Sequence, residues 1–109
     1  MNTNTVKDGK TIAIISYITI IGLIIAFVMN QNKKNYFASF HIRQAIGIAL
    51  LDLVISMVAN YMNLGIIGNI LGLGALALSI IGIIGAVQGE ERKIPFLGDQ
   101  FQEWFKSIG

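Results

Sequence analysis

Two long stretches without a single charged side chain constrain this chain more than any other feature of its sequence. Thr11–Met29 is one of them, and Leu53–Gly89 is the other. A small soluble domain buries only part of its chain's surface, so 109 residues cannot hide this much apolar surface from water. We therefore predict an all-α integral membrane protein, a helical bundle that forms a single membrane domain over residues 1–109.

The composition excludes several other classes of protein. Charged residues make up 13% of the chain, about half the roughly 25% of a typical soluble protein. The chain has no Cys and one His, which excludes a disulfide scaffold and a Cys/His metal site. The net charge of +2 is too small to indicate a nucleic-acid partner. Since no nucleophile elbow, phosphate loop or carboxylate pair occurs, we expect no enzyme activity, metal or cofactor.

Three stretches fit transmembrane helices, at about residues 11–29, 38–62 and 64–88. The first would span about 28 Å, close to the roughly 30 Å thickness of the hydrocarbon core. The second and third are joined by a short linker in which Asn63 and Gly65 tolerate the left-handed backbone of a helix stop. We predict three crossings, and four as the alternative if the third stretch divides at Gly72-Leu73-Gly74.

The placement of Lys and Arg predicts the orientation in the membrane. With three crossings, the first loop and the C-terminus share one side, which holds Lys33, Lys34, Arg43, Arg92, Lys93 and Lys106. The other side holds Lys7 and Lys10. We therefore expect a multi-pass protein of the bacterial inner (cytoplasmic) membrane, with its N-terminus outside and its C-terminus in the cytoplasm.

The end of the chain has the pattern of a short amphipathic helix, at about residues 99–108. Its apolar residues Phe101, Trp104, Phe105 and Ile108 follow the i, i+3, i+4, i+7 spacing of one helix face. Ten residues cannot cross a bilayer, so this helix is predicted to lie in the cytoplasmic interface. The alternative is that it packs against the end of the protein's own bundle.

Small residues repeat along the third stretch at alternating steps of three and four. They are Gly65, Gly68, Gly72, Ala75, Ser79, Gly82, Ala86 and Gly89. Such a seam, which we call the small-residue seam, lets helix backbones approach closely, and packing of this kind drives helix association in lipid. It fits either packing within the chain or an interface between copies.

Polar side chains at membrane depth form a second candidate site. Asp52 is the ionisable residue near the middle of its span, and Ser56 and Asn69 are candidate partners. An acid at this depth is costly unless it faces protein or water. It serves either as a proton or ion relay or as a structural hydrogen-bonding group between helices.

The beginning of the second span mixes aromatic and polar residues. Here His41 and Gln44 share one helix face, and Phe40 and Arg43 share another. Arg43 with Lys33 and Lys34 suggests a contact for a lipid phosphate or a partner chain. The alternative is an interfacial anchor in which the cations reach toward water.

Several of these segments together resemble a known family. They are Asp8-Gly9-Lys10-Thr11 leading into Ala13-Ile14-Ile15-Ser16-Tyr17, the run Phe37-Ala38-Ser39-Phe40-His41-Ile42-Arg43-Gln44, Ile80–Gly89, and Pro95-Phe96-Leu97-Gly98 before Phe101–Lys106. The chain resembles the Tic-twenty-like family of small bacterial membrane proteins, relatives of a chloroplast inner-envelope protein-import component. The resemblance implies a subunit of a polypeptide-conducting complex, and it singles out His41, Arg43, Gln44, Gln88 and Gly89.

The sequence therefore predicts a non-enzymatic membrane protein, a subunit of a larger membrane complex or homo-oligomer surrounded by membrane lipids. The alternative is a small transporter or proton/ion conductor that uses Asp52. A third possibility is a small bilayer-perturbing protein that acts through the face formed by Phe101 and Trp104.

Overall fold

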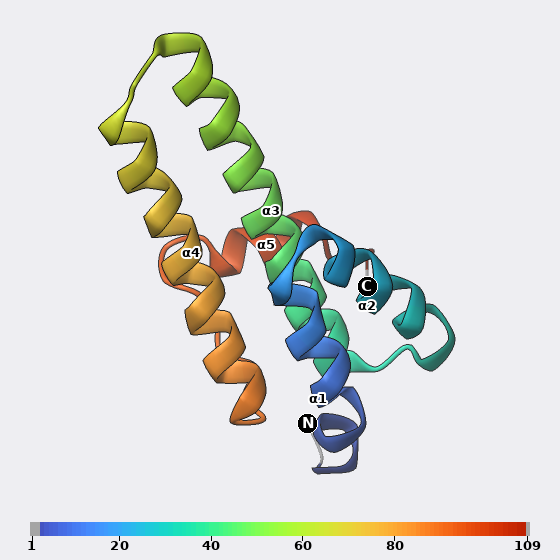
Figure 1. Cartoon of the computed structure of the whole chain (residues 1–109). Helices are drawn as coiled ribbons and strands as arrows, with labels where there is room; N and C mark the ends of the chain where they lie inside the picture. The colour runs from blue at the N-terminus through green and yellow to red at the C-terminus, as the bar shows by residue number, and fades with distance from the viewer. Residues whose placement is uncertain (1–2, 109) are drawn as a thin grey trace.

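The computed structural model describes residues 3–108, and the regular structure in this range is entirely helical (Figure 1). Its helices are α1 (Thr3–Ile18), α2 (Ile20–Lys33), α3 (Tyr36–Met62), α4 (Ile66–Val87) and α5 (Gly98–Trp104). The all-α prediction is confirmed for these residues.

The first predicted span is not one helix but two. Thr19 has an extended backbone, with φ −151° and ψ 170°, and separates α1 from α2. Its side-chain oxygen accepts a hydrogen bond from Gly22 N at 2.9 Å, and its carbonyl accepts one from Leu23 N at 2.8 Å. Both bonds satisfy backbone donors that the first turn of a helix leaves free. Thr19 therefore ends one helix and caps the next.

After this break, α2 runs back beside α1 (Figure 1). Gly22 makes the sharp reversal possible, because a Cβ there would lie 2.5 Å from the carbonyl oxygen of Ile15 in α1. At the other end of the pair, Asn35 Nδ2 donates to the carbonyl of Thr5 at 2.8 Å. The end of α2 and the start of α1 therefore lie at the same end of the molecule.

The prediction of three crossings is wrong because of this break. With 16 and 14 residues, α1 and α2 are about 24 and 21 Å long, shorter than the roughly 30 Å hydrocarbon core. By length and composition, two helices of the described chain could cross a membrane, α3 with 27 residues and α4 with 22. Only 17% and 22% of their most apolar windows are buried inside the protein.

The linker between α3 and α4 is the tight turn that the sequence predicts. Asn63 adopts φ 52° and ψ 49°, and Gly65 adopts φ 59°. Leu64 N donates to the carbonyl of Ala59 at 3.0 Å, which closes the end of α3. The turn joins α3 and α4 into an antiparallel hairpin (Figure 1).

The buried core lies at one end of this hairpin. One cluster consists of Ala13, Tyr17, Phe37, Ala45, Ile48, Ala86, Ile94 and Phe101, and a second of Ile12, Ala26, Ala38 and Ile42. No residue from 49 to 74 is buried, so the outer part of the α3–α4 hairpin presents its apolar side chains outward. Apolar side chains in this arrangement are stable when lipid surrounds them.

The C-terminal amphipathic helix is present but shorter than predicted. Phe101 of α5 is buried, and its ring occupies the space where a Cβ on Gly47 of α3 would lie. Gln102 Nε2 donates to the carbonyl of Phe40 at 2.8 Å. Trp104 on the same helix is 63% exposed. One face of α5 therefore packs on α3, as in the alternative that the sequence left open, while Trp104 remains at the surface. Of the other two predicted face residues, Phe105 caps the end of α5, and Ile108 lies beyond it in the C-terminal tail.

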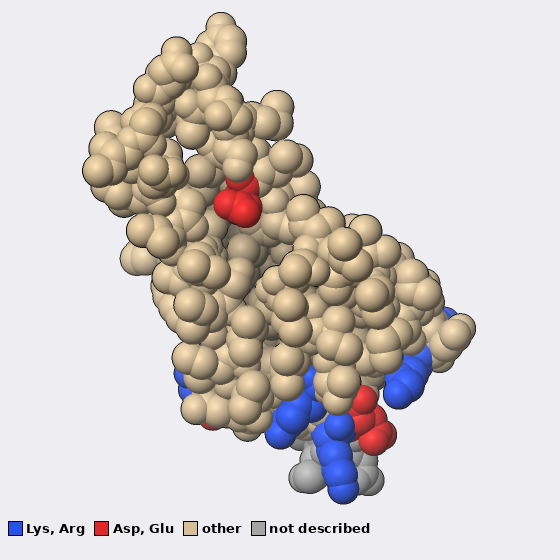
Figure 2. All heavy atoms as spheres, in the orientation of Figure 1, with Lys and Arg blue, Asp and Glu red and all other residues tan. Residues whose placement is uncertain are grey.

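Basic side chains gather at the same end as the core (Figure 2). The start of α1, the corner between α2 and α3, and the segments after α4 meet there. Together with the first turns of α3, these segments carry the eight cations of the sequence: Lys7, Lys10, Lys33, Lys34, Arg43, Arg92, Lys93 and Lys106. The expected three-crossing arrangement requires Lys7 and Lys10 to lie on the opposite side of the membrane from the other six cations. The structure does not separate them in this way. We call this region the basic end.

We predict that Phe101→Ala destabilises the protein by roughly 3–5 kcal/mol, because it empties the space over Gly47. The loss is measured as a change in unfolding free energy by denaturant titration in mild detergent. Trp104→Ala removes an exposed ring from the same helix and serves as the matched control. Equal losses in the two variants would contradict the packing of α5 described above.

Candidate functional site

A buried polar network lies at the centre of the basic end. The hydroxyl oxygen of Tyr17 in α1 lies 2.6 Å from His41 Nδ1. On the other side of the ring, His41 Nε2 lies 2.9 Å from the carbonyl oxygen of Glu90. A carbonyl can only accept, so His41 Nε2 carries the proton and Nδ1 accepts from the Tyr17 hydroxyl. In this arrangement the imidazole is neutral and both ring nitrogens are satisfied.

Gln44 completes the network one turn further along α3. Its Nε2 donates to the Tyr17 hydroxyl oxygen at 2.9 Å and to the carbonyl of Arg92 at 3.0 Å. Its Oε1 accepts from the Ile94 backbone N–H at 2.8 Å. The amide thereby holds the segment after α4 against α1 and α3. We call Tyr17, His41 and Gln44 the polar clamp.

Aromatic rings enclose the clamp. Phe37, Phe40 and Tyr17 contact the imidazole of His41 edge to face, with ring centroids 4.8, 5.1 and 5.5 Å away. Among the described residues, no buried side-chain polar atom lacks a hydrogen-bond partner. A saturated network of this kind specifies how the helices pack.

The residues predicted to contact lipid or a partner are divided between the interior and the surface. His41 and Gln44 are fully buried in the clamp. Lys33, Lys34 and Gln88 are exposed, and Gln88 accepts a hydrogen bond from Arg92 Nη2 at 2.7 Å. Sequence reasoning did not single out Tyr17 as a site residue, although it lies in one of the segments that carried the family resemblance and carries a hydroxyl in an apolar stretch.

Arg43 connects α3 to the C-terminal tail. Its Nε donates to the carbonyl of Ile108, and its Nη2 donates to the carbonyl of Lys106, both at 2.9 Å. These acceptors are neutral, so they orient the guanidinium group without balancing its charge.

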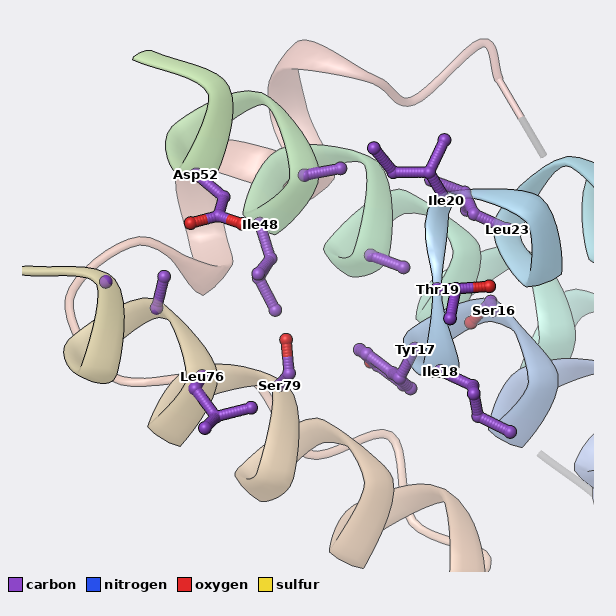
Figure 3. A pocket seen from close by; sticks show the side chains of 14 residues that line it. Ser16, Tyr17, Ile18, Thr19, Ile20, Leu23, Ile48, Asp52, Leu76 and Ser79 are labelled. Atoms are coloured by element: carbon purple, nitrogen blue, oxygen red, sulfur yellow. The ribbon is translucent and has the colours of Figure 1, made fainter. Parts of the chain in front are cut away.

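A second polar feature is a groove halfway along the α3–α4 hairpin. A cavity of about 210 Å³ lies between α3, α4 and the break that separates α1 from α2, and Figure 3 shows the side chains that line it. Asp52, Ser79 and Thr19 contribute polar groups to its lining. A cavity of about 630 Å³ continues toward the α3–α4 turn and is lined by Ser56, Asn69 and again Asp52. We call the two cavities together the Asp52 groove.

The small-residue seam packs against other residues at some positions and is open at Gly65 and Gly72. A Cβ on Gly68 would lie 2.7 Å from Ala59 Cβ of α3, and one on Gly82 would lie 2.5 Å from the ring of Tyr17. Ala75 and Ala86 of the seam are buried. A Cβ on Gly72, by contrast, would meet nothing within 4 Å, and Gly72 lines both cavities. The seam is therefore unfilled beside Asp52.

Asp52 is exposed in this groove and makes no hydrogen bond or ion pair with any described residue. The predicted bonds to Ser56 or Asn69 are not formed. Asp52 lies ten positions before Met62, where α3 ends, so it is about 15 Å from that end, half the thickness of a hydrocarbon core. No group of three His, Cys, Asp or Glu side chains within residues 3–108 could hold a metal ion.

Comparison with known families identifies the relatives of this chain. A family model matches residues 8–101, most of the chain: MamF/MmsF, the magnetosome magnetite crystal formation protein family. The chain belongs to this family. No curated protein and no solved structure matches it.

The family match corrects the resemblance drawn from the sequence. The chain is a MamF/MmsF protein rather than a Tic-twenty-like one, so the import component that the resemblance implied is wrong. The family and the two apolar helices indicate a small membrane-associated magnetosome-family protein, and they give no support to protein import or transport.

We predict that Gln44→Leu loosens the segment after α4, because it leaves the Ile94 N–H and the Arg92 carbonyl without partners. A buried unsatisfied group costs about 1–3 kcal/mol, so hydrogen exchange at the Ile94 amide should accelerate about tenfold or more. Mass spectrometry of exchange in detergent measures this rate. Gln88→Leu, which loses only an exposed bond to Arg92, should leave the rate unchanged. An unaltered Ile94 rate in Gln44→Leu would exclude a clamping role.

Proposed function

We propose that this chain is a non-enzymatic integral membrane protein that acts as a subunit of a larger assembly, formed with copies of itself or with other membrane proteins. The observation that carries the proposal is Asp52, an acid without a partner in an open groove at mid-membrane depth. Membership of the magnetosome magnetite crystal formation family supports a magnetosome membrane as the site of this assembly.

In this proposal α3 and α4 cross the membrane, and the α1–α2 pair enters it part-way from the basic end. The tip of that pair is apolar and exposed, with Ile18 at 62%, Ile20 at 65% and Ile21 at 71%. Such a tip requires lipid around it, because exposing this apolar surface to water is unfavourable. Since Lys and Arg favour the cytoplasmic side, the basic end and both termini lie in the cytoplasm.

Asp52 then faces the hydrocarbon layer unless something covers it. A carboxylate at the centre of a transmembrane helix costs about 2.5–3.5 kcal/mol on insertion scales. Another membrane-embedded helix that packs over Gly72 and Ser79 would remove Asp52 from lipid and supply a hydrogen-bond partner. The small-residue seam is open at Gly72, which permits the close approach that this packing needs.

An assembling role also fits the distribution of ligand groups. Iron sites in proteins use imidazole, carboxylate or thiolate ligands. Beyond Asp52, residues 53–89 contain no Asp, Glu, His or Cys, so the end opposite the basic end has no such ligand. We therefore assign the chain a part in organising a membrane assembly rather than in holding iron at that end. Membrane lipids and other membrane proteins are its partners in this proposal, and nucleic acid is not.

The proposed topology predicts that both termini lie in the same compartment. Reporter domains fused to the N-terminus and, in a second strain, to the C-terminus should both be active in the cytoplasm. A single Cys at Asn63, in the turn between α3 and α4, should react with an impermeant thiol reagent from the opposite side. Reporters active on opposite sides would overturn the two-crossing arrangement.

The proposed assembly predicts that position 72 contacts another protein. The chain has no Cys of its own, so Gly72→Cys carries one photoreactive thiol-linked crosslinker. In native membranes the labelled Gly72→Cys variant should crosslink to another protein. The crosslinked product should have twice the mass of the chain if the partner is a second copy. Gly74→Cys is the matched control, because both glycines have open space and Gly74 lies outside the groove.

Two results would contradict the assembly. One is a Gly72→Cys variant that crosslinks only to lipid, as frequently as Gly74→Cys does. The other is a purified monomer that conducts ions across proteoliposomes and loses conduction in Asp52→Asn, since that result would assign the groove to a conductor.

A further inference from the structure

A pocket at the basic end lies apart from both the polar clamp and the Asp52 groove. It forms where the end of α2, the first two turns of α3 and the C-terminal tail converge, and its volume is about 310 Å³. Lys34, Arg43, Tyr36 and Ser107 are among the residues that line it. We propose that this pocket binds the phosphate group of an anionic phospholipid. The proposal rests on the membrane placement of the proposed function.

The pocket carries positive charge that no carboxylate of the described residues balances. Lys34 and Arg43 line it, and none of the Asp or Glu side chains does. The ion pairs among residues 3–108 involve Arg92, Lys93 and Lys106 and leave these two cations without a carboxylate. Glu103, on the neighbouring helix α5, pairs with Lys106. An anion is therefore the ligand that the pocket's charge favours.

Arg43 is held in position for such a ligand. Its Nε and Nη2 donate to the carbonyls of Ile108 and Lys106, which fixes the plane of the guanidinium group. Its Nη1 makes no hydrogen bond to any described residue. A fixed guanidinium with free N–H groups suits a phosphate oxygen, because it loses little rotamer freedom on binding.

The surroundings of the pocket favour a phosphate on a lipid rather than a free one. Tyr36, which lines the pocket, is 76% exposed at the start of a helix that can cross the membrane. Exposed aromatic residues at helix ends lie at headgroup depth. Lipid phosphates are concentrated at that depth, and cytoplasmic leaflets are rich in anionic lipids. The pocket recognises a single phosphate group, and its position at headgroup depth favours the phosphate of a lipid over free phosphate.

The test compares two neighbouring lysines. Lys33 and Lys34 are both exposed, but only Lys34 lines the pocket. The full chain is purified in mild detergent, and native mass spectrometry measures the retention of phosphatidylglycerol against phosphatidylcholine. Lys34→Gln should weaken phosphatidylglycerol retention about fivefold. Lys33→Gln should match the wild type, and Arg43→Lys, which keeps the charge but loses the fork, should also weaken retention.

Other outcomes overturn the proposal. Equal losses in Lys33→Gln and Lys34→Gln would mean diffuse attraction to the basic end, and no loss in Lys34→Gln would exclude the pocket. Inorganic phosphate that displaces the lipid at equal concentration would assign the site to a free anion. Alkaline extraction of native membranes tests the proposed function separately: a chain that stays in the membrane but shows no Lys34 effect refutes only this inference.

Discussion

The backbone break at Thr19 determines how the rest of the chain is arranged. Had the apolar stretch around it continued as one helix, it would have crossed the bilayer and carried Lys33 and Lys34 to the side opposite Lys7 and Lys10. The Thr19 cap satisfies the first free N–H groups of α2, and Gly22 allows α2 to turn back against the carbonyl of Ile15. Because of this reversal, the start of α1 with Lys7 and Lys10 and the end of α2 with Lys33 and Lys34 lie at the same end of the molecule.

The same reversal makes the polar clamp possible. It holds Tyr17 near the tip of the α1–α2 pair, where its hydroxyl meets both His41 and Gln44. The clamp in turn binds backbone groups of Glu90, Arg92 and Ile94. Buried polar groups are costly when unpaired and specific when paired, so this network selects one arrangement of helices that apolar packing alone would leave loosely defined. The apolar core and the polar clamp therefore stabilise the same end of the molecule, and the clamp specifies the arrangement of the helices there.

The two ends of the α3–α4 hairpin differ in what stabilises them. At the basic end, side chains from α1, α2 and α5 cover the hairpin, and the small-residue seam receives Tyr17 against Gly82. Between residues 49 and 74 no described residue is fully buried, and Asp52 lies exposed in the groove that Gly72 also lines. The hairpin is therefore packed by the rest of the chain at one end and open at the other, which supports the assembly that we propose.

The sequence by itself determined the helical class, the lipid-compatible surface and the α3–α4 turn. Each depends on local properties: hydropathy, helix length, and the left-handed backbone that Asn63 and Gly65 accept. Only the tertiary structure decided that Thr19 is a break, because Thr and Ile around it are equally compatible with an unbroken helix in lipid. It also decided that His41 and Gln44 turn inward and that Asp52 does not, since a side chain's environment depends on which distant segment packs over it. Tyr17 packs against His41 and Gln44 and hydrogen-bonds with both. No described residue forms a hydrogen bond or ion pair with Asp52.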